Sequence, residues 1–218
     1  MTSPKYTDMY AQSESDTQYR KITSDHVSTI TVDGQEILKV ESEGLRLLTA
    51  EAMRDISHLL RTSHLEKLAK ILDDPEASDN DRFVAKELFK NANIAAGMVL
   101  PSCQDTGTGI IMGKKGQYVW TDGDDGETIN QGVIDTFTKT NLRYSQLAPK
   151  SLFEEANTKT NGPAQVDVYA TEGNEYHFLF VAKGGGSANK TFLYQQTPAI
   201  LREDKLTEFL DETLRTLG

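Results

Sequence analysis

The only cysteine among the 218 residues lies in a polar stretch that contains several glycines, VLPSCQDTGTGIIMG, residues 99–113. A thiol, an amide and a carboxylate follow one another at Cys103, Gln104 and Asp105. Such a loop could bind a metal through sulfur and hold a polar substrate beside it. One thiol is not a complete metal site, because an iron–sulfur cluster needs three or four thiolates and zinc needs four ligands. The alternative is a cysteine packed under a turn, and the spacing alone leaves both interpretations open.

Two further stretches could bind an anion. In AKGGGSANKT, residues 182–191, three glycines expose backbone N–H groups, and Lys183 and Lys190 add positive charge. The stretch lacks the spacing of a nucleotide-binding P-loop, and its alternative interpretation is a flexible exit from a strand. In NLRYSQ, residues 141–146, Arg143 could clamp a carboxylate with two N–H groups, although an arginine at a helix end commonly remains solvated.

Other metal sites receive no support from the sequence. The four histidines, at positions 26, 58, 64 and 177, do not share the spacing of a helical metal site. The acidic stretch TDGDDGET, residues 121–128, resembles the beginning of a calcium loop but lacks the terminal glutamate of that motif. We interpret it as an acidic turn that caps a helix.

Local patterns predict the elements that would position these residues. Asp33-Gly34 is a strong two-residue turn signal between β-branched residues, so residues 28–40 are expected to form a hairpin. Three helices should follow, with Thr49, Ser63 and Ser78 as their candidate N-caps.

After residue 100 the pattern changes to strands. Residues 109–113 and 117–120 are expected to form two short strands around a turn, and a helix should cover 126–145. A second hairpin is expected within 164–194, around the turn EGN, and a last helix over 203–217. The predicted fold is α+β, with an N-terminal helical layer packed against a mixed β-sheet built from hairpins. Residues 1–25 should form a polar arm, and 26–218 a single domain.

Composition limits the partners and the compartment. The net charge of −10 and the pI near 4.9 argue against nucleic acid or an anionic membrane as a partner. No apolar run approaches the ~18–20 residues of a membrane span, and the first residues lack the apolar core of a secretory signal. One cysteine cannot form an internal disulfide. We expect a cytoplasmic protein, with a mitochondrial location left open.

Several stretches, taken together, resemble the N-terminal half of class I fumarases, which are oxygen-sensitive iron–sulfur hydratases. They are LPSCQDTGTGIIMGKKGQYVWT, NLRYSQLAP, NGPAQVDVY and AKGGGSANKTFLYQQT. The resemblance extends from about residue 20 to the end of the chain. Within this group, GKKGQYVWT and KGGGSANKT are more similar to single-chain fumarases than to two-subunit fumarases and tartrate dehydratases.

The resemblance implies a role for each candidate residue. Cys103 would be one of three thiolates that hold a [4Fe–4S] cluster whose fourth iron binds the substrate. Gln104 and Asp105 would contact the dicarboxylate, and Asp105 would also be a catalytic proton-transfer residue. Arg143 would hold a substrate carboxylate, and Gly186 would contact the substrate through its backbone.

The resemblance also implies that the chain is the N-terminal domain of a longer enzyme, which hydrates fumarate reversibly to (S)-malate and is a homodimer when complete. The other two cluster cysteines would lie in the missing C-terminal part, so this part alone is expected to hold no cluster and to be inactive. One alternative is a related hydro-lyase, a tartrate dehydratase or a mesaconate hydratase. The other is a non-catalytic binding module.

Overall fold

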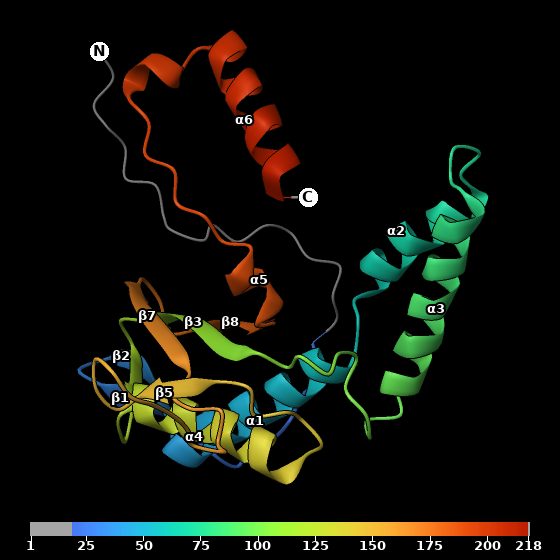
Figure 1. The fold of residues 1–218 in the computed structure, drawn as a ribbon. Helices are drawn as coiled ribbons and strands as arrows, with labels where there is room; N and C mark the ends of the chain where they lie inside the picture. Colours follow the sequence, from blue (N-terminus) through green and yellow to red (C-terminus); the bar gives the residue numbers. More distant parts are fainter. Residues whose placement is uncertain (1–18, 218) are drawn as a thin grey trace.

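The computed structural model describes residues 19–217 (Figure 1). Most of the predicted polar arm, residues 1–18, therefore lies outside the described residues. The remainder of that arm, residues 19–25, forms neither helix nor strand. No helix among the described residues has both the length and the apolar character needed to cross a membrane.

The predicted N-terminal hairpin is confirmed. Strands β1 (Val27–Val32) and β2 (Gln35–Val40) are antiparallel, and Val32 pairs with Gln35 across the two-residue turn. Asp33 and Gly34 have φ angles of 50° and 81°, the positive values that a tight hairpin turn requires. β2 also pairs in parallel with the short strand β4 (Val119–Thr121).

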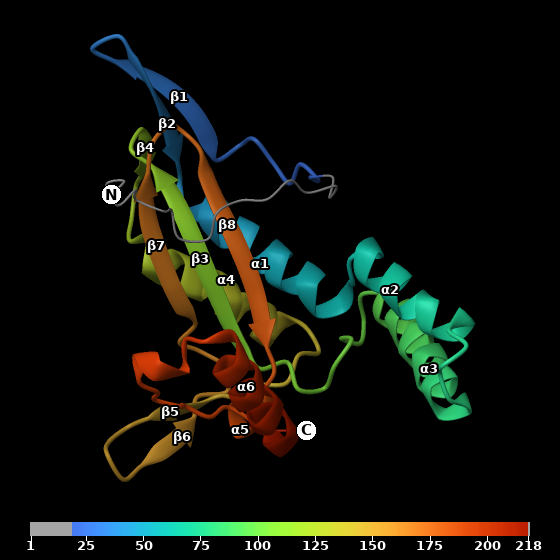
Figure 2. The same ribbon diagram turned by 90° about the horizontal axis from the view of Figure 1, so that it is seen from above.

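The second sheet differs from the expected pairings. Strand β3 (Thr108–Gly116) lies between β7 (Gln165–Thr171), to which it is parallel, and β8 (Tyr176–Lys183), to which it is antiparallel (Figure 2). The prediction of a hairpin within 164–194 is wrong. The two strands expected around a turn at 114–116 are present as β3 and β4, but residues 114–116 belong to β3 and the two strands do not pair with each other. β7 and β8 are joined by a tight turn but separated by β3, and β4 belongs to the other sheet.

Two helices form the layer that covers this sheet. They are α1 (Ser42–His58) and α4 (Asp125–Lys139), which pack against each other and against β8 and β7. Helices α2 (Thr62–Asp73) and α3 (Asp79–Ala95) instead pair with each other and project from the body (Figure 1). The α+β class is therefore confirmed. The covering layer consists of α1 and α4, however, and not of the three N-terminal helices. Among the long strands of the described residues, β1 and β2 are the consecutive pair that forms a hairpin.

The predicted helix caps had mixed outcomes. Ser78 caps α3 as expected, in a reciprocal capping box with Asp81. Thr49 is wrong as a cap, because α1 already begins at Ser42 and Thr49 lies buried within it, where its hydroxyl donates to the carbonyl of Leu45 at 2.9 Å. Ser63 is also wrong, because α2 begins one residue earlier and has no side-chain cap.

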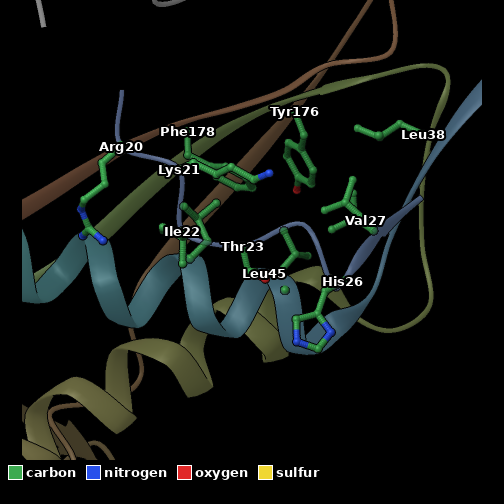
Figure 3. Close-up of a pocket in the computed structure, with 13 residues that line it drawn as sticks. Arg20, Lys21, Ile22, Thr23, His26, Val27, Leu38, Leu45, Tyr176 and Phe178 are labelled. Carbon is green, nitrogen blue, oxygen red and sulfur yellow. The ribbon is translucent and has the colours of Figure 1, made fainter. Parts of the chain in front are cut away.

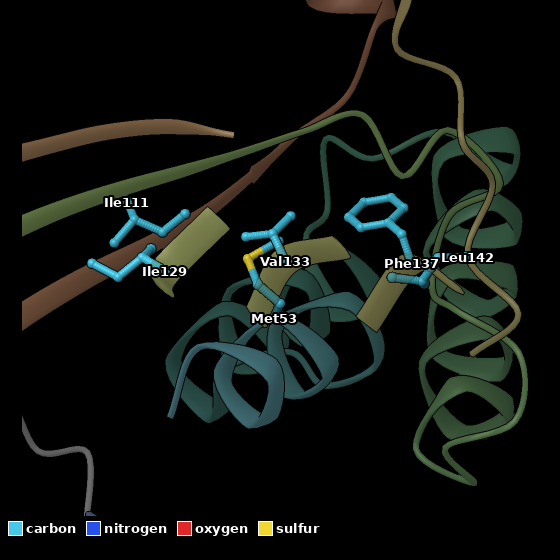
Figure 4. Close-up of a cluster of buried hydrophobic side chains, with 6 residues drawn as sticks. All are labelled: Met53, Ile111, Ile129, Val133, Phe137 and Leu142. Carbon is cyan, nitrogen blue, oxygen red and sulfur yellow. The ribbon is translucent and has the colours of Figure 1, made fainter. Parts of the chain in front are cut away.

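The core forms where the two covering helices meet the sheet (Figure 4). Met53 of α1 and three apolar residues of α4, spaced four apart, pack against the inward face of β3. The buried members of this cluster are Met53, Ile111, Ile129, Val133, Phe137 and Leu142. The spacing of four places one continuous apolar stripe of α4 on the sheet.

The remaining elements include the boundaries of α4, a two-stranded ribbon and the C-terminal helices. α4 begins with Asp124 as its N-cap, confirming the acidic turn, but it ends at Lys139 rather than near residue 145. β5 (Leu147–Pro149) and β6 (Glu155–Asn157) form a small ribbon. The chain then closes with α5 (Gly186–Asn189), a 3₁₀ turn (Pro198–Ile200) and the predicted last helix, α6 (Glu203–Leu217).

Candidate active site

Antiparallel pairing of β3 and β8 brings two of the predicted stretches together. Thr108, the first residue of β3, pairs with Lys183, the last residue of β8. The cysteine loop that enters β3 therefore lies beside the glycine turn that leaves β8. In the sequence these segments are about eighty residues apart, and only the sheet places them side by side.

A hydrogen bond joins the two segments directly. The backbone N–H of Gly186 donates to Oδ2 of Asp105 at 3.0 Å. The backbone of Gly185 also lies close, since a Cβ added there would sit 3.3 Å from both carboxylate oxygens. The glycine turn was predicted to bind an anion, and an anionic side chain of this same chain contacts it. None of the residues whose side chains the structure describes hydrogen-bonds to the second oxygen of Asp105, Oδ1.

The two lysines of this stretch are peripheral to that contact. Lys183 makes a long hydrogen bond from Nζ to the carbonyl of Gly184, at 3.4 Å. Lys190 is exposed.

Arg143 reaches the same region through its backbone. The buried hydroxyl of Thr106 donates to the carbonyl of Arg143 at 2.5 Å, which fixes the segment after α4 against the cysteine loop. The Arg143 side chain is exposed, and its guanidinium has no ion-pair partner in the described part of the chain. The prediction of a helix-end arginine needs a correction, because α4 ends four residues earlier and Arg143 lies in the following loop.

Asn161 is a central residue that the sequence reasoning missed. It is fully buried with a φ of 55°, and its amide donates to the carbonyl of Gly107. Its side-chain oxygen accepts the backbone N–H of Gln146 at 2.9 Å. Asn161 thus ties the loop after α4 to the cysteine loop. The Asn-Gly-Pro sequence at 161–163 marks a turn, which was the available signal.

Cys103 and Gln104 are both exposed in the loop between α3 and β3. Across residues 19–217, no three His, Cys, Asp or Glu side chains gather closely enough to hold a metal ion. A [4Fe–4S] cluster requires several converging thiolates. The donor set of this chain therefore fits one ligand of such a cluster, Cys103, and does not by itself fit the whole group.

A separate cavity of about 300 Å³ lies at the other end of β8 (Figure 3). Its lining is mostly apolar and includes Leu38, Leu45, Tyr176 and Phe178, with Arg20 and other N-terminal residues at one side. β8 runs from Tyr176 to Lys183, so the cavity is roughly 20 Å from the cysteine loop, at about 3.3 Å per residue. This cavity is not part of the candidate site.

An ionic cluster beneath that cavity connects β3, α4 and β8. Oδ2 of Asp125 accepts hydrogen bonds from Lys115 Nζ at 2.7 Å and from the Tyr176 hydroxyl at 3.0 Å. Burial alone would raise the pKa of Asp125, but these hydrogen bonds outweigh it and the pKa is lowered. Burial and the nearby carboxylate raise the pKa of Tyr176. The cluster therefore consists of an ionised carboxylate, a lysine and a neutral phenol, a structural tie between three elements.

Comparison with known proteins adds a family to this geometry. The family model described as "Fumarate hydratase (Fumerase)" matches residues 46–218. The anaerobic class I fumarate hydratase of Escherichia coli K12 is 55% identical over 209 residues, which are 96% of this chain and 38% of that protein. The aerobic class I enzyme of the same organism is 56% identical over 203 residues, 93% of this chain and 37% of that protein.

A eukaryotic relative shows the same pattern. "Fumarate hydratase 1, mitochondrial" of Leishmania major is 52% identical over 208 residues, 94% of this chain and 38% of that protein. The chain therefore spans well under half the length of the curated relatives that it matches. Because the family model covers most of the chain, from residue 46 to residue 218, the chain belongs to the fumarate hydratase (Fumerase) family.

Proposed function

We propose that this chain supplies the N-terminal part of the active site of a class I fumarate hydratase, which interconverts fumarate and (S)-malate. The observation that carries the proposal is its 52–56% identity, over 93–96% of the chain, to enzymes of that name. The contact between Asp105 and Gly186 and the nearby backbone of Arg143 give it a structural basis.

Substrate binding in this proposal uses the free polar groups around the start of β3. A dicarboxylate would place one carboxylate against the Arg143 guanidinium, whose planar fork can form two parallel hydrogen bonds. The exposed amide of Gln104 would donate a further hydrogen bond. Gly186 would contact the substrate through its backbone, beside the Asp105 carboxylate that its N–H holds.

Proton transfer is assigned to Asp105. The Gly186 N–H fixes Oδ2, so the other oxygen, Oδ1, is the one available to a substrate. In the direction from malate to fumarate, Oδ1 would accept a proton from the substrate, and in the reverse direction it would return it. A base of this kind must lie within hydrogen-bond reach of the proton, and the fixed carboxylate provides that orientation.

Cys103 is assigned as one thiolate ligand of a [4Fe–4S] cluster, with the other ligands in the remainder of the longer enzyme. When bound, such a cluster supplies a Lewis acid that polarises the hydroxyl lost or gained in the reaction. Two consequences concern this chain alone. It should be inactive as an isolated polypeptide, and its thiol should remain open to alkylation.

The organisation of the protein is part of the proposal. We assign residues 26–218 to one N-terminal domain, preceded by an arm over 1–25, in an enzyme that is a homodimer when complete. A reducing compartment is proposed because a thiolate ligand must stay unoxidised; the cytoplasm is the expected one, with a mitochondrial location as the alternative. Analytical ultracentrifugation of the complete enzyme tests the dimer, and an outcome of monomers at micromolar concentration would reject it.

The decisive experiment replaces the matching part of the anaerobic E. coli enzyme by this chain, because the two are 55% identical over 209 residues. The chimera is reconstituted anaerobically and assayed with fumarate, (S)-malate, tartrate and mesaconate. Hydration of fumarate with a normal iron content is the expected result. A kcat/KM at least tenfold higher for tartrate or mesaconate would replace the substrate assignment, and an iron-loaded chimera with no hydratase activity would overturn the proposal.

Three variants test the residue roles. Cys103→Ser should lose most of its iron, because a hydroxyl is a poor iron ligand. Asp105→Asn should keep its iron and lose kcat by about 10²-fold. Arg143→Lys should lose at least about tenfold in kcat/KM. Arg202→Lys is the matched control, because Arg202 is exposed and directly precedes α6. Normal iron in Cys103→Ser, or a loss below twofold in Arg143→Lys, would remove that residue from the site.

A further inference from the structure

Cys103 and Gln104 lie between two residues, Ser102 and Asp105, that are held by hydrogen bonds. Neither residue makes a hydrogen bond with another residue that the structure fully describes. The C-terminal anchor is strong, because Asp105, Thr106 and Gly107 are all held by residues from other elements. The position of the thiol therefore depends on what holds the N-terminal side, Ser102.

Ser102 is held by two helices. Its N–H and its hydroxyl both donate to the carbonyl of Ser57, at the end of α1, at 2.9 and 3.1 Å. Its carbonyl accepts a hydrogen bond from the side-chain amide of Asn91, in α3, at 2.7 Å. Asn91 lies one helical turn before the end of α3, so its side chain turns back onto the loop that leaves the same helix.

The Asn91 contact acts on the peptide group of the cysteine. The carbonyl of Ser102 and the nitrogen of Cys103 belong to one planar unit. Fixing that oxygen therefore fixes the nitrogen of Cys103 and the direction from which its side chain leaves the backbone. Without Asn91, the peptide could rotate between the bonds that hold Ser102 and those that hold Asp105.

We infer that Asn91 is a positioning residue for the Cys103 thiolate, acting through the carbonyl of Ser102. The inference rests on the proposed function, in which the Cys103 sulfur must be held in place to serve as one ligand of a cluster. It extends the candidate site to α3, which belongs to the projecting pair of helices. No motif in the sequence identifies Asn91, because eleven residues separate it from the carbonyl that it holds.

The single cysteine makes a direct test possible. A nitroxide label on Cys103 of the 218-residue chain reports the mobility of the loop, with no background cysteine to remove. Asn91→Ala deletes the donor, and Asn91→Asp keeps the shape but replaces the amide N–H groups by oxygen. Asn93→Ala is the matched control, because Asn93 lies on the same helix, is exposed and has no partner among the described residues.

We expect both Asn91 variants to narrow the lines of the label's electron paramagnetic resonance spectrum, which indicates greater mobility. Because Ser102 loses the hydrogen bond from Asn91 to its carbonyl, the rate of hydrogen exchange at the Ser102 amide should rise by about fivefold, the effect of losing one ordinary hydrogen bond. Asn93→Ala should leave both readouts at their wild-type values. Exchange elsewhere in α3 should be unchanged in all three variants. The inference is overturned if Asn91→Ala matches wild type, if Asn91→Asp retains the wild-type mobility, or if exchange rises throughout α3, which would indicate loss of helix stability instead of loop positioning.

A second arm separates this inference from the proposed function. In the reconstituted chimera, the half-time of iron release to a chelator is measured for wild type, Cys103→Ser, Asn91→Ala and Asn93→Ala. Faster release in Asn91→Ala than in Asn93→Ala is expected. If Cys103→Ser retains iron, the proposed function fails. If Cys103→Ser loses iron while Asn91→Ala releases it at the wild-type rate, only the positioning role fails.

Discussion

Gly107 offers a sharp test of how the site is assembled. It is buried between Thr106 and β3, its φ is 61°, and a Cβ placed on it would lie only 1.6 Å from the carbonyl oxygen of Lys183. Real Cβ contacts stay beyond 3.0 Å, so Gly107→Ala must move one of the two backbones by at least about 1.4 Å. The obstacle is backbone in the β3–β8 pairing, which cannot rotate out of the way as a flexible side chain could.

The expected cost has two parts. A positive φ costs an alanine about 1 kcal/mol relative to glycine. The displacement of β8 adds the disruption of a buried contact, which brings the total to roughly 3 kcal/mol or more. Gly34→Ala is the control, because Gly34 also has a positive φ, 81°, but has open space around the new methyl group. It should therefore cost only about 1 kcal/mol.

Urea unfolding of the 218-residue chain measures both variants. The same displacement should separate the cysteine loop from the glycine turn, so hydrogen exchange at the Gly186 amide, which Asp105 protects, should rise in Gly107→Ala and stay unchanged in Gly34→Ala. If the two substitutions destabilise the chain equally and the Gly186 amide stays protected in both, the close packing of Gly107, before β3, on Lys183, at the end of β8, is refuted.

Three further outcomes are expected. Arg46 donates to Asp135 at 2.6 Å and lowers the pKa of that carboxyl. The ion pair therefore stabilises the fold above about pH 4, and this stabilisation is lost as the pH falls through the lowered pKa of Asp135 in the folded chain. Asp135→Asn should flatten the dependence of the urea midpoint on pH in this range. Thr106→Val leaves the carbonyl of Arg143 without its donor and should cost about 1–2 kcal/mol in the same assay, whereas an unchanged midpoint would argue against that hydrogen bond. α6 exposes an apolar stripe that includes Leu214, so the isolated chain should self-associate with increasing concentration in sedimentation runs, and Leu214→Lys should reduce the association.

The outcome for each predicted element follows from the range of the interactions that form it. The Asp33-Gly34 turn and the Ser78 cap depend on residues within four positions, so their local sequence was sufficient to predict them. Thr49 carries the same local signal as a cap, but tertiary packing buries it inside α1, and its hydroxyl bonds within the helix. A capping residue within a helix looks the same in sequence as one at its start.

The residue types of the candidate site were evident from the sequence, because a lone thiol, a carboxylate and three glycines stand out in their surroundings. Their arrangement was not evident, because it depends on β3 inserting between β7 and β8, a pairing between segments tens of residues apart. That pairing alone brings Gly186 to Asp105 and Lys183 to Gly107. The supporting amides follow the same rule: Asn91 and Asn161 are ordinary polar residues in the sequence, and only the folded chain places each against a carbonyl of the cysteine loop. The local sequence thus identified the candidate groups, and long-range strand pairing determined where each one lies.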